Sequence, residues 1–239
     1  MIDQKTALVT GASRGIGRAI ALHLAAAGLR VALHYNANLP AAEETRRQLP
    51  GAGHLLLSAD LADPDAAEQL AADAQAAHGG RVDVLVHNAG LYEATPLLDD
   101  NDFAAWRAAM HRQMQVNFWA GADLAYHLAP PMASAGWGRI IQISSRAGLR
   151  GEARHAGYAA SKAAQISFIR SLAAELGPSG VGCFGVAPGW TETDMAADAL
   201  ATRGEQVAII WEGDDPAASK HSSFIAENML WQSPQLQLS

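Results

Sequence analysis

Short apolar runs alternate along the chain with longer, helix-like segments. The apolar runs are rich in aliphatic and β-branched residues and show no polar alternation; they lie at residues 7–10, 30–35, 54–58, 82–87, 139–144 and 181–187. Such continuous runs are typical of parallel strands that are buried on both faces, and the intervening segments are long enough for right-handed crossover helices. The pattern therefore predicts one sheet of six parallel strands with helices on both faces.

Four helices are predicted between these strands, at residues 15–27, 64–78, 101–128 and 157–176. Gly28 follows the first helix, and Asp63 precedes the second and can cap it. Pro130 and Pro131 should end the third helix, since proline cannot donate the backbone hydrogen bond that continues a helix. Gly177 and Pro178 close the fourth.

A glycine-rich segment, Thr10-Gly11-Ala12-Ser13-Arg14-Gly15-Ile16-Gly17, follows the first strand and opens the first helix. Glycines at such a turn let the backbone approach a pyrophosphate, and the helix N-terminus offers unpaired N–H groups and a positive dipole end. The segment therefore predicts a dinucleotide site. A plain tight turn, or a site for another ligand such as S-adenosylmethionine, is the alternative.

The end of the second strand bears on the choice of cofactor. Enzymes that prefer NAD place an acidic residue there to bind the ribose 2′-hydroxyl, but residues 34–38 contain no carboxylate. Arg14 can supply a cation for a 2′-phosphate, and Asn36 can donate a neutral hydrogen bond. This predicts NADP(H), with a solvated surface charge as the alternative for Arg14.

A second polar cluster follows the fifth strand. Ser145 lies at the carboxyl end of that strand, where open parallel sheets bind ligands. Tyr158 and Lys162 lie four residues apart and so share one helical face, which predicts that the ammonium stabilises the phenolate and lowers a pKa of about 10. Tyr158 is therefore the predicted general acid/base.

Together these motifs resemble the short-chain dehydrogenase/reductase family from residue 5 to about residue 195, and within it the 3-oxoacyl-acyl-carrier-protein reductases. The resemblance also rests on Asp60-Leu61, Asn88-Ala89-Gly90, Asn117, and Pro188-Gly189 with Thr191 and Thr193. It implies a Rossmann-type, doubly wound α/β sheet that binds NADP(H). His87 stands where the family often has asparagine.

The resemblance also implies roles for individual residues. Ser145 would bind the substrate oxygen, Tyr158 would protonate it as hydride reaches carbon, Lys162 would bind the nicotinamide ribose, and Asn117 would hold a water that links Lys162 to solvent. These four are the expected catalytic residues. The expected cofactor-binding residues are Gly11, Ser13, Arg14, Gly15, Ile16, Gly17, Asn36, Asp60, Leu61, Asn88, Ala89, Gly90, Tyr158, Lys162, Pro188, Gly189, Thr191 and Thr193.

Composition narrows the partners. The net charge of −7 and the isoelectric point of about 5.7 oppose binding to nucleic acid or anionic membranes. No apolar run approaches the roughly 20 residues of a membrane helix, no secretory signal pattern opens the sequence, and Cys183 is the only cysteine. The nine histidines show no metal-ligand spacing, so no metal is expected. These features predict a cytoplasmic enzyme with a small carbonyl or alcohol substrate.

Two other functions stay open: reduction of 3-oxoacyl groups on an acyl carrier protein, and a noncatalytic NADP(H)-binding sensor or scaffold. Three arginines, Arg146, Arg150 and Arg154, suggest a further hypothesis, that they attract an anionic substrate. They lie between the predicted catalytic serine and tyrosine.

The chain reads as one domain, residues 1–239, whose tail at 212–239 departs from the family pattern. The tail predicts a helix at 215–231 but no convincing last strand, so the sixth strand would be left with a bare edge. A homodimer or homotetramer is expected, which retains a contact through the helices at 101–128 and 157–176.

Overall fold

The computed structural model describes residues 4–98, 102–189 and 209–212. Its sheet has the strand order β3-β2-β1-β4-β5-β6-β7, and the first six strands are mutually parallel, which confirms the prediction. The strands are β1 (Thr6–Val9), β2 (Arg30–Tyr35), β3 (Leu55–Ser58), β4 (Val84–His87), β5 (Gly138–Ile143), β6 (Val181–Ala187) and β7 (Ile209–Glu212).

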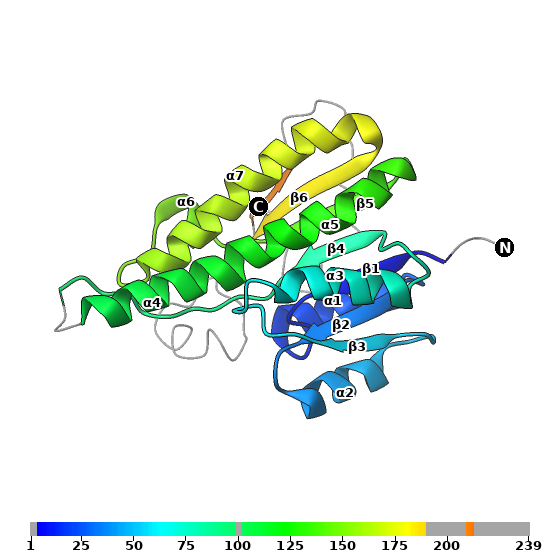
Figure 1. Cartoon of the computed structure of the whole chain (residues 1–239), viewed down its shortest axis with the longest axis horizontal. Helices are drawn as coiled ribbons and strands as arrows, with labels where there is room; N and C mark the ends of the chain where they lie inside the picture. Colours follow the sequence, from blue (N-terminus) through cyan, green and yellow to red (C-terminus); the bar gives the residue numbers. More distant parts are fainter. Residues whose placement is uncertain (1–3, 99–101, 190–208, 213–239) are drawn as a thin grey trace, which may run out of the picture.

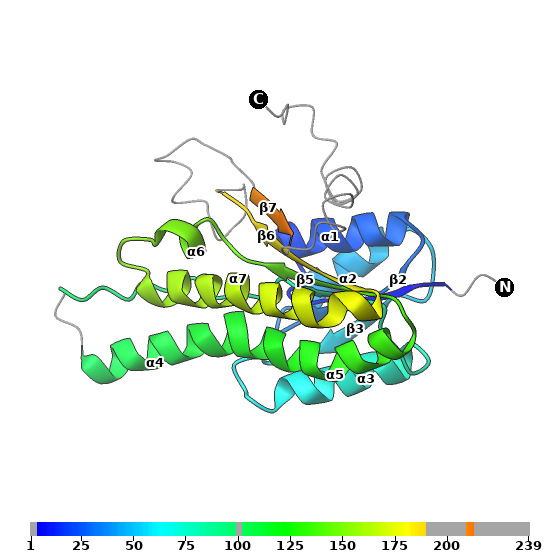
Figure 2. The same ribbon diagram turned by 90° about the horizontal axis from the view of Figure 1, so that it is seen from above.

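Helices cover both faces of this sheet, as Figure 2 shows. One face packs against α1 (Gly15–Ala26) and lies near α2 (Leu39–Gln48), and the other packs against α3 (Ala66–Ala77), α5 (Ala120–Ser134) and α7 (Ala156–Leu176). In Figure 1 the helices α3, α5 and α7 lie side by side across the sheet. The helix α4 (Phe103–Met114) continues the line of α5 beyond the sheet. This is the doubly wound architecture that the apolar pattern predicts.

The continuous apolar strands are explained by these two layers. Leu8, Leu85 and Ile140 are register partners on adjacent strands, and all three are fully buried beneath α3, α5 and α7. Val84 and Val86 point to the opposite face and join the core under α1. Both faces of β4 are therefore buried, and neither selects polar residues.

The predicted end of the third helix before the prolines is wrong. The helical segment passes from α4 through a π-helical turn, η1 (Gln115–Trp119), into α5, which contains Pro130 and Pro131. Pro131 cannot donate to the carbonyl of His127, and Gln75 Nε2 donates to that oxygen instead, at 3.4 Å. Burial of Leu128 and Met132 on the same face holds this last turn in place.

Three smaller predictions also need correction. The helix after Asp63 begins only at Ala66, and the Asp63 carboxylate accepts from the backbone N–H of Asp65 at 3.1 Å. Neither α2 nor the short α6 (Ala147–Arg150) was expected. The sixth strand is not bare, because β7 pairs with it antiparallel. The predicted tail helix at 215–231 lies outside the described residues.

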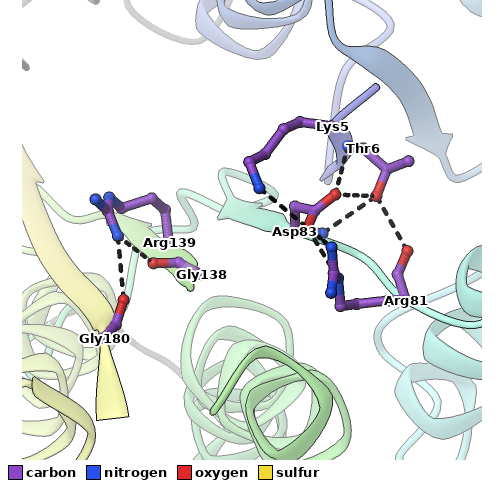
Figure 3. A network of polar contacts seen from close by, with 7 residues as sticks. All are labelled: Lys5, Thr6, Arg81, Asp83, Gly138, Arg139 and Gly180. Atoms are coloured by element: carbon purple, nitrogen blue, oxygen red, sulfur yellow. Dashed lines mark hydrogen bonds and ion pairs between the residues drawn. The ribbon is translucent and has the colours of Figure 1, made fainter. Parts of the chain in front are cut away.

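A charged network around Asp83 holds the edge of the sheet that is formed by the amino-terminal ends of the strands (Figure 3). The Asp83 carboxylate, 5% exposed, accepts from the Thr6 N–H at 2.8 Å and is ion-paired with Arg81 at 2.8 Å and Lys5 at 3.8 Å. The network ties the start of β1 to the start of β4.

In the parts of the chain that the structure describes, no helix has the length and apolarity needed to cross a bilayer.

Candidate active site

A cavity of about 550 Å³ opens where the parallel strands end. Its volume lies within the range of small-molecule sites, about 300–1,000 Å³. The sequence predicted sixteen of its lining residues, from segments far apart in the chain: Gly11, Ser13, Arg14, Gly15, Ile16, Asn36, Asp60, Leu61, Asn88, Ala89, Gly90, Ser145, Tyr158, Lys162, Pro188 and Gly189. Thr191 and Thr193 lie outside the described residues.

The glycine turn between β1 and α1 forms one wall of the cavity. Gly11 and Gly15 have φ angles of +63° and +55°, in the left-handed region that favours glycine. Gly17 does not line the cavity; it lies beneath the turn, where a Cβ atom would come within 2.3 Å of the Gly11 carbonyl oxygen. Its contribution is therefore close packing under the turn.

His34 fixes this turn from behind, a role that the sequence did not reveal. Its Nδ1 accepts from the Gly11 N–H at 3.2 Å, and its Nε2 bonds the Ala59 carbonyl oxygen at 3.0 Å. The ring is therefore neutral with the proton on Nε2, in keeping with burial, which lowers the pKa of His34. It links the turn to β2 and to the segment after β3.

The two residues predicted to bind a 2′-phosphate, Arg14 and Asn36, lie beside the turn. Arg14 is exposed and lines the cavity together with Asn36 and Asp60. The Asn36 amide donates to the Asp60 carboxylate at 3.3 Å, so the carboxylate nearest to the end of β2 is engaged by a neighbouring amide. The arrangement places one guanidinium and one amide at this end of the cavity.

Tyr158 and Ser145 form the opposite wall, and their side chains are hydrogen-bonded. Burial raises the pKa of the Tyr158 phenol, the bond from Ser145 acts against this rise, and the charge of Glu152 adds to it. The prediction of a lowered pKa for Tyr158 is therefore wrong. The phenol retains its proton at neutral pH.

Lys162 lies beneath Tyr158 and is 3% exposed. Its ammonium donates to the Ile143 carbonyl oxygen at 2.8 Å and lies 5.6 Å from the centroid of the Tyr158 ring. Burial lowers the pKa of Lys162 to about 7. Among the described residues it forms no ion pair, so desolvation is not offset by a carboxylate.

Asn117 lies in the π-helical turn and does not line the cavity. Its Oδ1 accepts from the Leu91 N–H at 2.7 Å, and its Nδ2 donates to the Leu91 carbonyl oxygen at 3.0 Å and to Ser161 Oγ at 2.9 Å. A Cβ atom on Gly90 would lie 3.3 Å from Asn117 Oδ1 and 3.5 Å from Lys162 Nζ. Asn117 therefore lies directly behind the cavity wall, close to the lysine.

His87 connects the glycine turn to Asn117. Thr10 Oγ1 accepts from the N–H groups of Asn88 and Ala89, both at 2.9 Å, and so directs its own proton to His87 Nδ1 at 3.2 Å. His87 Nε2–H then donates to the Asn117 carbonyl oxygen at 3.2 Å. Burial, assisted by the charge of Lys162, lowers the pKa of His87 to about 3, so the ring stays neutral.

Comparison with known proteins agrees with this geometry. The family model for short chain dehydrogenases matches residues 5–204. A 3-oxoacyl-[acyl-carrier-protein] reductase from Synechocystis is 37% identical over 81% of this chain and 77% of its own length. A cis-4-hydroxycyclohexanecarboxylate dehydrogenase from Sinomonas cyclohexanicum is also 37% identical, over 81% of this chain and 76% of its own length.

A solved structure shows the same likeness. The 3-oxoacyl (acyl-carrier-protein) reductase of Agrobacterium tumefaciens, crystallised with NADP bound, is 34% identical and superposes with a TM-score of 0.74, over 82% of this chain and 74% of that one. The chain therefore belongs to the short-chain dehydrogenase family and is an oxidoreductase.

Proposed function

We propose that this protein is an NADP(H)-dependent reductase or dehydrogenase that interconverts a carbonyl and an alcohol, with Tyr158 as acid/base. The observation that carries the proposal is that Ser145, Tyr158 and Lys162 share one cavity with the glycine turn. A dinucleotide and a small substrate bound there would meet the acid/base group together.

The residues present fit a dinucleotide. Gly11 and Gly15, both at positive φ, line the cavity without a side chain, and the N-terminus of α1 begins at Gly15. Arg14 and Asn36 would hold the 2′-phosphate, and Asp60 and Leu61 the adenine. Crystallised relatives with NADP bound support NADP(H) as the dinucleotide. When bound, the nicotinamide supplies or accepts the hydride.

The side chains of the opposite wall move the proton. Ser145 donates to the substrate oxygen and orients it, and Tyr158 transfers its phenolic proton to that oxygen as charge develops there. The raised pKa of Tyr158 suits this direction, because the phenol carries the proton before reaction. Alcohol oxidation is the reverse: the phenolate accepts the proton. Lys162, 5.6 Å from the ring centroid, is placed to stabilise that phenolate.

A carrier-linked thioester is the second candidate, because the matching relatives from Synechocystis and Agrobacterium tumefaciens are reductases of this kind. An acidic carrier protein needs a basic docking surface. The net charge of −7 and the absence of a basic residue in Gly177-Pro178-Ser179-Gly180 favour a small substrate.

The proposal is tested by following NADPH absorbance with a panel of ketones, aldehydes and 3-oxoacyl thioesters, the last both free and carrier-linked. We expect turnover of free carbonyl compounds and no gain from the carrier. A large preference for the carrier-linked thioester would favour the second candidate. Cofactor binding without turnover of any member would contradict the proposal and favour a sensor.

The proposal includes a homo-oligomer. Three large aromatic side chains are exposed on the outer face of the α4–η1–α5 segment: Phe103 (67%), Trp119 (51%) and Tyr126 (77%). Aromatic groups at that exposure are typical of subunit contacts. Light scattering should give a dimer or tetramer, and Trp119→Glu should weaken it. A monomeric parent protein would contradict this assignment.

A further inference from the structure

The substrate end of the cavity contains two residues that the mechanism does not use, Tyr92 and Glu152. Tyr92 comes from the segment after β4, and Glu152 from the connection between α6 and α7. Both line the same cavity as Ser145 and Tyr158. A substrate whose carbonyl oxygen is bonded to Ser145 and Tyr158 therefore lies next to these two side chains.

The ring of Tyr92 is held on two sides. It is stacked on His155, with ring centroids 4.1 Å apart and planes 5° apart. It also meets the ring of Tyr158 edge-on, at 4.8 Å and 87°. Aromatic contacts of this geometry fix a ring in place. Tyr92 therefore forms a rigid wall beside the proton donor.

Glu152 is a carboxylate that faces the cavity from a largely buried position. Its side chain is 12% exposed, and its Oε2 is ion-paired with Arg150 at 3.3 Å. An ionised carboxylate has about four acceptor sites, so Glu152 can accept a hydrogen bond from a substrate in addition to the bonds it makes within the protein. Glu152 and Tyr158 line the same cavity, and the charge of Glu152 adds to the rise in the pKa of Tyr158 that burial causes.

The charges around Glu152 indicate which kind of substrate group would donate a hydrogen bond to its carboxylate. Arg150 balances the charge of Glu152, and Arg146 also lines the cavity. The substrate end is therefore not an anionic site, which disfavours a cationic substrate. Arg150 is ion-paired with Glu152 and does not itself line the cavity, so the hypothesis that it attracts an anionic substrate is weakened. A neutral hydroxyl group suits the site best, since it can donate to the carboxylate.

We infer that Glu152 is a specificity-determining residue that accepts a hydrogen bond from a substrate hydroxyl, so the preferred substrates are hydroxylated carbonyl compounds. The inference rests on the proposed function. It assigns the carbonyl to Ser145 and Tyr158, the hydroxyl to Glu152 and the carbon skeleton to the face of Tyr92. A site built to bond a hydroxyl discriminates against an analogue that cannot donate, because the carboxylate then loses a partner.

The test compares ketones that differ only in that donor: hydroxyacetone with methoxyacetone, and benzoin with its methyl ether. The methoxy compounds retain the electron-withdrawing oxygen but cannot donate. In the parent protein we expect kcat/KM to favour the hydroxy compounds by roughly tenfold to a hundredfold, mainly through KM. Glu152→Ala should bring the ratio close to one, and Glu152→Gln should give an intermediate ratio.

Glu44→Gln is the matched control, because Glu44 is also ion-paired with an arginine, Arg47, but on α2 and away from the cavity. This control should retain the parent ratio. Thermal unfolding and NADPH affinity show whether each Glu152 variant is folded. A ratio near one in the parent, or an unchanged ratio in Glu152→Ala, would overturn the inference while the reductase function stands. If the parent binds NADPH but reduces none of these ketones, the proposed function fails, and the inference with it.

Discussion

The sheet has one edge formed by the amino-terminal ends of its strands and another formed by their carboxyl-terminal ends. Both contain a buried charged side chain, but in the described part of the chain the charge is balanced by an ion pair at only one of them. At the amino-terminal edge, Asp83 is ion-paired with Arg81 and Lys5 and accepts from the backbone of Thr6 (Figure 3). At the carboxyl-terminal edge, Lys162 is equally buried, yet among the described residues its ammonium forms no ion pair and donates to the carbonyl oxygen of Ile143.

The difference separates stability from chemistry. Opposite charges at the amino-terminal edge offset the cost of desolvation, so this network serves to hold β1 and β4 together. At the other edge no carboxylate of the described residues offsets the desolvation of Lys162, so burial lowers the pKa of this lysine to about 7. Perturbed groups that line a cavity are typical of active sites. Substitutions at the two edges should therefore affect different measurements.

Apart from substitution of the proton donor Tyr158, the largest effect is expected for Ser145→Ala. The substitution removes the hydroxyl that orients the substrate oxygen and bonds Tyr158. Loss of one such donor should lower kcat about a hundredfold to a thousandfold. Steady-state rates and NADPH titration measure both parts of the prediction: turnover falls, and NADPH affinity stays at the parent value. A fall in affinity alone would place Ser145 outside the chemistry.

Asp83→Ala should instead lower the stability of the protein and leave its catalytic activity unchanged. The buried N–H of Thr6 loses its acceptor, so the free energy of unfolding should fall by about 1–3 kcal/mol, or roughly 2–4 °C in Tm for each kcal/mol. The exposed Asp73 on α3 offers a control, since Asp73→Ala should change Tm little. The kcat/KM of the folded Asp83 variant should equal that of the parent; a large loss of activity at unchanged Tm would contradict the separation of the two edges.

Arg14→Glu should reverse the choice of cofactor. A carboxylate at this position would face the 2′-phosphate of NADPH and repel it, whereas NADH has no charge there. We expect the ratio of kcat/KM for NADPH over NADH to fall at least tenfold, about 1.4 kcal/mol. Equal efficiency with both cofactors in the parent would already count against the role of Arg14.

Lys162→Met should change how stability depends on pH. Because burial lowers the pKa of Lys162 from 10.5 to about 7, the unfolded chain binds more protons than the folded chain between these values. The lysine therefore makes the parent more stable as the pH rises through this window. Relative to the variant, the parent should gain up to about 1 kcal/mol between pH 7 and pH 8. Parallel pH profiles of the two proteins in chemical denaturation would refute this.

Much of this arrangement is readable from the sequence, because it depends on local pattern. Uninterrupted apolar runs predict the six parallel strands, and the spacing of Tyr158 and Lys162 places both on one face of α7. Strand ends then determine which loops meet at the site. Sixteen of the predicted site residues line one cavity for this reason.

What the sequence did not reveal depends on tertiary contacts. The helix continues through Pro131 because Gln75, distant in sequence, satisfies the freed carbonyl. Similarly, His34 and His87 carry no motif, and only the fold shows that each bonds a backbone group of the site. The pKa of Tyr158 differs from the prediction because burial raises it more than the hydrogen bond from Ser145 lowers it.

The most direct test of the account is the rate of hydride transfer in Tyr158→Phe. A preformed NADPH complex is mixed with a ketone that the parent reduces, and NADPH oxidation is followed through a single turnover. Tyr126→Phe, at a position on α5 that does not line the cavity, is the control. We expect Tyr158→Phe to bind NADPH with parent affinity and to react about a hundred to ten thousand times more slowly, because the phenol supplies the proton. A single-turnover rate close to that of the parent would contradict the assignment of Tyr158 as the proton donor.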